Sequence, residues 1–284
     1  MNVSDAQPQR PLEAVILAAG KGTRMGSDLP KVLHPVGGRA MVQWVVDACE
    51  AVGVRRTVVI VGHEAQMVRR ELGARRNIHF VEQTQQLGTG HAVRQAESLY
   101  KGVDADALVL CGDGPLIRPQ TLTKLLETHR TERASATLAT AVLENQRGYG
   151  RIIRDGAGRF QRIVEEKEAS ESQKAIREVN PSYYCFRSPD LFAVLSRVTN
   201  ANAKGEYYLT DVPELLLKEH KTVAVVNAVP PEDVLSINTP EELAEVDGVM
   251  RARLATCGSR PATQRFEPQA ATRKTQASFG GVHS

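Results

Sequence analysis

Apolar runs of strand length recur in the first part of the chain, separated by stretches with helical spacing. The runs lie at 12–18, 57–62, 78–82 and 107–111. They are rich in valine, isoleucine and leucine without strict alternation, which is typical of strands buried on both faces of a parallel sheet. From Met41 to Val52 apolar residues recur every three or four positions, and Gly53 follows where a helix would end. Alternating strands and helices predict parallel strands joined by right-handed crossovers.

After Pro119 the pattern becomes richer in β structure. Short β-prone runs lie at 136–142, 150–155, 160–164 and 182–187. Residues 155–158, with the sequence DGAG, have the composition of a hairpin turn. A last helix is predicted to start with Thr239 as its cap, Pro240 at the first position and Glu242 completing a capping box. We therefore predict an α/β fold, a Rossmann-like doubly wound mixed sheet, with a second half that covers the first as a lid.

The two ends of the chain lack the large apolar residues of a core. Residues 1–11 are polar and carry proline, and residues 255–284 are dominated by alanine, threonine, glutamine, arginine and glycine. Both segments are predicted to be disordered, which leaves 12–254 as the ordered domain. No apolar run approaches the roughly 20 residues that a membrane span needs, and residues 1–11 do not resemble a signal sequence. The sequence predicts a soluble protein with no membrane partner.

The net charge of +3 is unevenly distributed along the chain. Six basic residues and one acidic residue follow Met250, whereas residues 1–250 carry 30 basic and 32 acidic side chains. A nearly neutral body has no general affinity for polyanions, so we expect no nucleic-acid partner.

The four cysteines give no sign of a zinc site or a disulfide framework. They are far apart, without a Cys-x-x-Cys pair or neighbouring histidines, at Cys49, Cys111, Cys185 and Cys257. This usage favours a reducing, cytoplasmic location.

The segment LAAGKGTRM, Leu17–Met25, places two glycines at the end of the first predicted strand. A dinucleotide-binding fingerprint would need a third glycine where Met25 stands, and no Walker-type ending of glycine, lysine and serine or threonine follows. A short glycine turn at the carboxyl end of a parallel strand is nevertheless a position where open α/β sheets bind ligands. Its amides would face phosphate oxygens, with charge supplied by Arg24 and Lys31. A tight surface turn with two solvated cations is the structural alternative.

Further motifs follow this segment in a characteristic order. They are LPK at 29–31, QTQQLGTGHA at 83–92, CGDGPLI at 111–117, GYGRI at 148–152, IVEEK at 163–167, EVN at 178–180 and NAKGEYYLTD at 202–211. Together they resemble the signature of the sugar-1-phosphate nucleotidyltransferases. The resemblance is strongest to the uridylyltransferase domain of the bifunctional bacterial N-acetylglucosamine-1-phosphate uridyltransferase / glucosamine-1-phosphate acetyltransferases. It covers roughly residues 12–250. It implies a fold of the nucleotide-diphospho-sugar transferase type, with a nucleotide-binding half at 12–118 and a sugar-binding half at 119–254.

The resemblance implies transfer of UMP from UTP to N-acetyl-α-D-glucosamine 1-phosphate, giving UDP-N-acetylglucosamine and pyrophosphate. The partners would be UTP and the sugar 1-phosphate, and the catalytic residues Arg24, Lys31 and Asp113. The attacking phosphate is already an anion, so the site needs positive charge and backbone donors rather than a general base. Mg²⁺ is the implied cofactor, held by Asp113 and Asn238, because magnesium selects hard oxygen ligands.

The resemblance also implies a set of substrate-binding residues. Those along the nucleotide are Leu17, Ala18, Ala19, Gly20 and Gly22. Those that read the uracil ring are Gln83, Gln86, Gly88 and Thr89. Those on the sugar side are Tyr149, Gly150, Glu165, Asn180, Glu206 and Tyr207. Three more positions that match substrate-binding sites are Cys111, Gly112 and Asn238.

Alternatives remain open at several of these positions. Asp113 lies in the sequence GDGP, which is a good turn in its own right, and Asn238 directly precedes a helix cap. Pro181 and Ser182 stand where the family usually has threonine and glycine, so another sugar or another base is the second hypothesis. From another functional class, a non-catalytic nucleotide-sugar-binding regulator is an alternative. A nicotinamide oxidoreductase is the third, and Met25 disfavours it.

No six-residue repeat of the kind that forms the β-helix of the bifunctional relatives follows Leu254. We therefore expect neither acetyltransferase activity nor a trimer built on such a helix, and the sequence predicts no particular oligomeric state.

Overall fold

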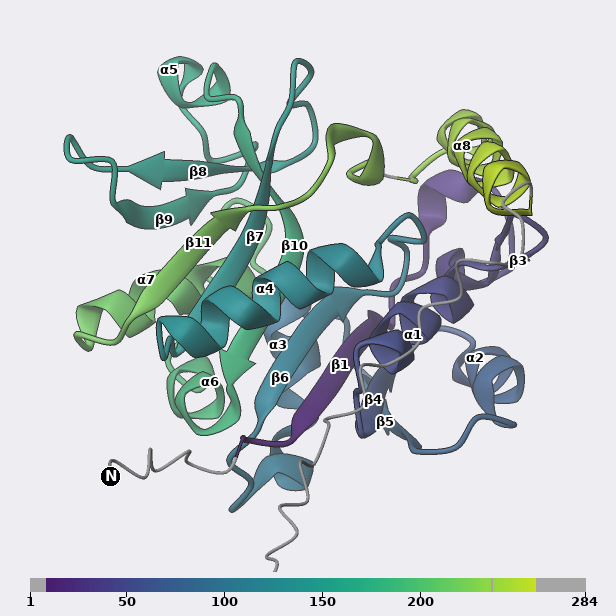
Figure 1. Cartoon of the computed structure of the whole chain (residues 1–284), viewed down its shortest axis with the longest axis horizontal. Coiled ribbons are helices and arrows are strands. Elements are labelled where there is room, and N and C mark those ends of the chain that lie inside the picture. The colour runs from purple at the N-terminus through teal and green to yellow at the C-terminus, as the bar shows by residue number, and fades with distance from the viewer. Residues whose placement is uncertain (1–8, 236, 259–284) are drawn as a thin grey trace, which may run out of the picture.

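The structure is a computed structural model that describes residues 9–235 and 237–258. Within them the main sheet has nine strands in the order β11-β7-β10-β6-β1-β4-β5, with β8 and β9 attached beside β10 (Figure 1). Its strands are β1 (Leu12–Ala18), β4 (Arg56–Val61), β5 (Ile78–Glu82), β6 (Asp106–Cys111), β7 (Ala136–Val142), β8 (Gly150–Arg154), β9 (Phe160–Val164), β10 (Glu178–Arg187) and β11 (Val223–Asn227). A separate hairpin pairs β2 (Pro35–Val36) with β3 (Arg39–Ala40).

Helices connect most of these strands. The α-helices are α1 (Met41–Ala51), α2 (Ala65–Leu72), α3 (Thr89–Arg94), α4 (Pro119–Thr131), α5 (Glu171–Lys174), α6 (Ser188–Leu195), α7 (Val212–Lys218) and α8 (Pro240–Gly258). Short 3₁₀ turns are η1 (Thr23–Met25), η2 (Lys31–Leu33), η3 (Glu97–Tyr100), η4 (Leu209–Asp211) and η5 (Pro231–Asp233). Over the described ranges, no helix combines the length and the apolar character that crossing a bilayer requires.

Helices cover both faces of the central strands. β1 runs parallel to β4 on one side and to β6 on the other. Its residues alternate between two apolar clusters: Ala14 and Ile16 pack with residues of α1, α2 and α4, whereas Val15 packs with residues of α3, α6 and α7. This confirms the predicted doubly wound sheet and explains the unbroken apolar runs, since a strand buried on both faces has no polar side.

The second half of the chain extends this sheet instead of covering it as a lid, so that part of the sequence-based prediction was wrong. β10 pairs antiparallel with β6, placing Tyr184 opposite Val109, and β7 and β11 continue outward from β10. Only β8 and β9 lie off this path. Antiparallel pairing with the central strand joins the two halves by backbone hydrogen bonds.

Several predicted element boundaries are confirmed. α1 ends just before Gly53, which has φ +85°. The Asp155 amide donates a hydrogen bond to the Arg159 carbonyl and closes the β8–β9 turn. The Glu242 amide donates to the Thr239 hydroxyl at the start of α8. β10 is longer than predicted because a bulge continues it back to Glu178.

The described residues begin before the expected start of the domain and run past its expected end. Pro11 accepts a backbone hydrogen bond from Asp106, and helix α8 continues to Gly258. The described residues therefore include part of both segments that were expected to be disordered. The prediction for residues 1–8 and 259–284 falls outside the described residues.

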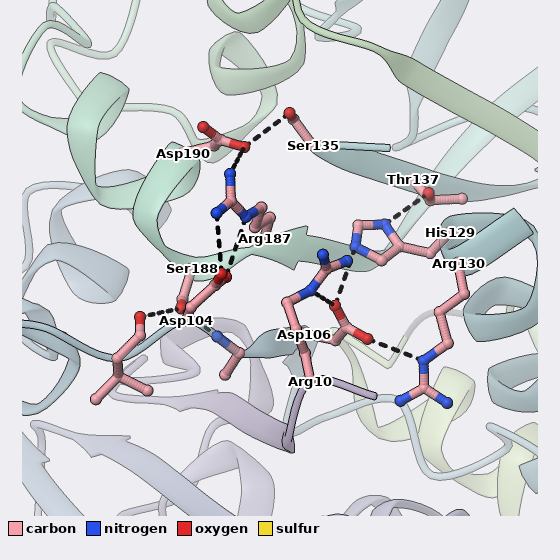
Figure 2. Close-up of polar contacts among 12 residues, drawn as sticks. Arg10, Asp104, Asp106, His129, Arg130, Ser135, Thr137, Arg187, Ser188 and Asp190 are labelled. Carbon is pink, nitrogen blue, oxygen red and sulfur yellow. Dashed lines mark hydrogen bonds and ion pairs between the residues drawn. The ribbon is translucent and has the colours of Figure 1, made fainter. Parts of the chain in front are cut away.

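A buried carboxylate at the start of β6 holds the N-terminal segment against α4. Figure 2 shows Asp106 between two arginines: its carboxylate lies 2.6 Å from Arg10 Nε and 2.9 Å from Arg130 Nε. His129 Nε2 lies 3.6 Å from the same carboxylate, and His129 Nδ1 is 2.9 Å from the Thr137 hydroxyl. This polar cluster lies at the opposite end of β6 from Asp113, so it stabilises the fold at a distance from the candidate site.

A third, smaller apolar cluster lies beneath α8. It contains Met25 from the glycine-rich loop, Met41 from α1, Leu116 from the segment after β6, and Ile237 and Met250 around α8. In Figure 1 this helix lies apart from the sheet, beside β3 and α1. The cluster therefore joins α1 to three segments that are distant in sequence and that each carry a predicted site residue.

Candidate active site

The glycine-rich loop leaves the carboxyl end of β1 and brings Lys31 back against Gly22. Gly22 has φ +64°, and a Cβ atom built on it would lie 2.8 Å from the Lys31 Cβ. Any side chain at position 22 would displace the lysine stem, apart from the cost of a left-handed backbone. The glycine is thus explained by this close approach.

Four predicted residues converge through side-chain contacts. The Lys31 ammonium donates to Asp113 Oδ2 at 2.5 Å and to Asn238 Oδ1 at 3.3 Å. Arg24 Nη2 donates to the same Asn238 oxygen at 2.8 Å. The side chains come from the loop after β1, the end of β6 and the segment before α8. The structure therefore brings the three predicted catalytic residues and the second predicted metal ligand to one point.

Asp113 and Asn238 offer oxygens that fit a magnesium ion. Both oxygens point at the same positive charge, the Lys31 ammonium. The described part of the chain has no group of three or more His, Cys, Asp or Glu side chains that could hold a metal. An ion here would complete its shell with phosphate oxygens and water, as magnesium commonly does at phosphoryl-transfer sites.

A cavity of about 880 Å³, here called the main cavity, opens beside these charges. Among the predicted residues it is lined by Arg24, Lys31, Cys111, Asp113, Tyr149, Gly150, Glu165, Asn180 and Asn238. Lysines at its wall that were not predicted are Lys167, Lys174 and Lys204. A space of this size accepts a ligand as large as a nucleotide sugar, and its cations suit phosphate groups.

A second space, the side cavity of about 190 Å³, shares part of its wall with the main cavity. The residues that line both are Cys111, Glu165, Ser182, Lys204 and Tyr208. Three other predicted residues line the side cavity but not the main cavity: Leu17, Thr89 and Glu206. The geometry thus provides a large charged space with a smaller compartment beside it.

Polar groups at the sugar end are held by the surrounding chain. Glu165 accepts a 3.0 Å hydrogen bond from Thr210, and burial raises the pKa of its carboxyl. Asn180 is buried, donates to the Tyr184 hydroxyl at 2.6 Å and accepts from the Ser182 amide at 3.2 Å. The Tyr149 hydroxyl donates to the Val234 carbonyl. These contacts fix the orientation of each group toward the main cavity.

The predicted base-reading loop is joined by backbone hydrogen bonds to the 202–211 segment. Tyr207 donates to the Leu87 carbonyl at 2.8 Å and accepts from the Gly90 amide at 2.8 Å. Gly88 has φ +107°, and a Cβ there would lie 2.6 Å from the Tyr207 oxygen. Gln86 donates to the Ala19 carbonyl at 2.7 Å, which ties the loop to the glycine-rich turn.

Some predicted residues line neither cavity. They are Ala18, Ala19, Gly20, Gly22, Gln83, Gln86, Gly88, Gly112 and Tyr207. Several support the walls of the site without lining a cavity. Gln83, for example, is buried and donates to the Gly88 carbonyl at 3.1 Å. A Cβ on Gly112 would lie 3.0 Å from the Leu17 carbonyl oxygen. Their assignment to substrate stays a prediction.

Tyr208 is the main residue that the sequence analysis missed. It is buried, lines both cavities, and its hydroxyl has no hydrogen-bond partner. Burial raises its pKa to about 12. Tyr207, which was predicted instead, packs toward His91 with ring centroids 6.3 Å apart. Because neighbouring residues of an extended segment point in opposite directions, an adjacent pair of tyrosines gives no signal of which one faces the site.

Comparisons with known proteins show the family to which the chain belongs and the proteins that it resembles. Residues 14–210 match the family described as the MobA-like NTP transferase domain. The chain is 48% identical over 243 residues to the bifunctional protein GlmU of Pelotomaculum thermopropionicum, covering 86% of this chain and 53% of that protein. It is 43% identical over 267 residues to GlmU of Geobacillus thermodenitrificans, covering 94% and 58%. The chain thus spans little more than half the length of these relatives.

The fold is similar to that of a solved UDP-glucose pyrophosphorylase in complex with UDP-glucose. The TM-score is 0.70 at 17% identity, over 86% of this chain and 100% of that one. The likeness confirms the predicted nucleotide-diphospho-sugar transferase fold.

Proposed function

The chain belongs to the MobA-like NTP transferase family, and we propose that it transfers UMP from UTP to N-acetyl-α-D-glucosamine 1-phosphate, releasing pyrophosphate. The observation that carries this proposal is the convergence of Arg24, Lys31, Asp113 and Asn238 beside the main cavity. The motif resemblance and the 43–48% identity to GlmU proteins support the choice of substrates.

The reaction needs charge stabilisation more than proton transfer. An oxygen of the sugar phosphate attacks the α-phosphorus of UTP, and the bond from that phosphorus to the oxygen bridging the α- and β-phosphates breaks. The electron pair leaves with pyrophosphate. Arg24 and Lys31 would oppose the repulsion between the two polyanions and stabilise the charge that develops on the transferred group. Preorganised cations of this kind lower the barrier without reorganising during the reaction.

We propose Mg²⁺ as the cofactor, held by Asp113 and Asn238. When bound it would supply positive charge to the phosphate oxygens. Asp113 and Asn238 also hold the Lys31 ammonium, so the lysine is positioned where phosphate oxygens would lie.

The side cavity supports an N-acetylated sugar. Its wall combines the apolar side chains of Leu17, Val109 and Leu110 with the polar side chains of Thr89, Glu165 and Thr210. An acetamido group has a methyl group for the apolar wall and two polar atoms for a hydroxyl partner. We also propose a cytoplasmic location, which is supported by the free cysteines of the described residues, Cys49, Cys111 and Cys185.

Pyrophosphate release from the purified protein tests the proposal, with Mg²⁺, UTP and a panel of sugar 1-phosphates. We expect turnover with N-acetylglucosamine 1-phosphate and little with glucose 1-phosphate. A clear preference for a sugar without the acetamido group, or for another nucleoside triphosphate, would replace the substrate assignment. Tight binding of UDP-N-acetylglucosamine without any turnover would instead favour a regulator.

A further inference from the structure

Ser182 has an unusual backbone conformation in the middle of a strand. Five non-glycine residues of the described chain have positive φ, and Ser182, at φ +65°, is the one that lies inside a strand. A left-handed conformation costs free energy for any residue with a side chain, and glycine would avoid that cost. Residues held in this way concentrate at ligand sites, where the surrounding structure fixes them.

The conformation belongs to a bulge that directs Ser182 into the site. The pairing of β10 with β7 shifts register between Val179 and Tyr183. Pro181 interrupts the ladder, and the Ser182 amide donates to the Asn180 side-chain oxygen at 3.2 Å. As a result Ser182 forms part of the wall shared by the main cavity and the side cavity.

The Ser182 side chain lies close to two buried groups, Cys111 and Tyr184. Burial raises the pKa of Cys111 to about 12 and that of Tyr184 above its ordinary value, and the nearby Ser182 side chain opposes both shifts. A hydroxyl has one donor and two acceptor positions, so it can contact a protein group and a ligand at the same time. Ser182 lies at the boundary that a sugar substituent would cross to enter the side cavity.

We propose that Ser182 is a specificity-determining residue, whose hydroxyl hydrogen bonds the acetamido group of the acceptor sugar at the boundary between the two cavities. The inference rests on the proposed function and deepens it, because it assigns the discrimination between N-acetylated and plain sugars to one side chain. It also gives the strained backbone a chemical reason: the side chain that causes the strain presents a hydroxyl to the ligand.

Two substitutions separate the hydroxyl from the backbone strain. Ser182→Ala removes the hydroxyl and keeps the Cβ that causes the strain, whereas Ser182→Gly removes both. In both variants we expect kcat/KM for N-acetylglucosamine 1-phosphate to fall about 3- to 10-fold, the effect of one neutral hydrogen bond. The KM for UTP and the weaker activity with glucose 1-phosphate should stay within about twofold of wild type. The Tm of Ser182→Gly should exceed that of Ser182→Ala by about 2 °C, since only the glycine relieves the strain.

The outcomes distinguish this inference from the proposed function. Equal losses with both sugars, or no loss in Ser182→Ala, would overturn the specificity role although the enzyme remains a nucleotidyltransferase. If the wild type turns over no sugar phosphate, the proposed function fails, and calorimetry with UDP-N-acetylglucosamine still tests Ser182. A Kd about 3- to 10-fold weaker in Ser182→Ala would support the contact, and an unchanged Kd would exclude it.

Discussion

The Lys31 ammonium lies 2.5 Å from the Asp113 carboxylate, although 82 positions separate the two residues in the sequence. The two charges hold one another in place beside the main cavity, and each has a separate role in the proposed reaction. Substitution of Asp113 should therefore abolish turnover, whereas substitution of Lys31 should lower kcat.

Asp113→Asn should abolish turnover while leaving the fold intact, because an amide keeps the shape of the carboxylate but not its charge. Asp113→Ala should do the same. We expect pyrophosphate release to fall below detection in both variants at every Mg²⁺ concentration, with circular dichroism unchanged. Restoration of activity by high Mg²⁺ would show that Asp113 is not an essential ligand.

Lys31→Ala should lower kcat by about 10³-fold or more, as expected for removal of a charge that stabilises the transition state. The KM for UTP should change much less. Lys21→Ala is the control and should leave kcat unchanged, since Lys21 belongs to the same loop, is exposed and lines neither cavity. Near-normal rates in both Lys31→Ala and Asp113→Ala would mean that the active site lies elsewhere.

Two glycines of the loop offer a matched pair. Gly22 and Gly26 have nearly the same backbone, with φ +64° and +61°, but only at Gly22 would a Cβ meet Lys31, at 2.8 Å. Gly22→Ala and Gly26→Ala should both destabilise the fold by about 1 kcal/mol through the left-handed backbone. Only Gly22→Ala should also lower kcat, by about tenfold or more, because it displaces the lysine. Equal kinetic losses would point to loop conformation alone.

Arg253 near the end of α8 should stabilise both the helix and the segment after Asp113. Its guanidinium is ion-paired with the buried Asp233 and donates to the Leu116 carbonyl at 2.8 Å. Arg253→Ala should cost about 1–3 kcal/mol of unfolding free energy, since it leaves a buried carboxylate with one cation fewer. It should also raise the Mg²⁺ concentration needed for half-maximal activity, because Leu116 lies three residues after Asp113.

Arg251 on the same helix provides the control. It pairs with Asp247 at 2.6 Å but is largely exposed, so Arg251→Ala should leave both the unfolding free energy and the Mg²⁺ dependence close to those of wild type. Urea unfolding and a Mg²⁺ titration of both variants make the comparison. Equal stabilities would indicate that the Arg253 pair contributes no more than a surface contact.

His129 should make stability depend on pH below neutrality. It is fully buried, and burial lowers its pKa to about 4, compared with about 6.5 in an unfolded chain. The folded state therefore favours the neutral ring, and protonation favours unfolding. The stability from this group is fully present above about pH 6.5 and is lost as the pH falls toward 4 and below, by on the order of 3 kcal/mol.

His129→Gln should flatten that part of the stability curve, measured by urea unfolding between pH 7 and pH 4. His79 is exposed, so His79→Gln should leave the curve as in wild type. If the slope is unchanged in His129→Gln, the pH dependence arises from the carboxylates instead.

The sequence predicted the central strands well because their burial on two faces leaves a continuous apolar signal, as in β1 and β6. The convergence of Lys31, Asp113 and Asn238 followed from motif resemblance, and no local pattern shows it. The bulge at Ser182, the position of Tyr208 on the walls of both cavities and the Arg253–Asp233 pair were not predicted. Each depends on contacts between segments distant in sequence or on which side of an extended chain a residue faces, and periodicity does not report either.

The backbone bonds between Tyr207 and the loop containing Leu87 and Gly90 have a consequence for how such a site can evolve. Hydrogen bonds made by main-chain atoms survive nearly any change of side chain. The 202–211 segment can therefore exchange its side chains while the loop predicted to read the base keeps its position. Substitutions can accumulate in one segment without moving the other, provided that position 88 stays glycine.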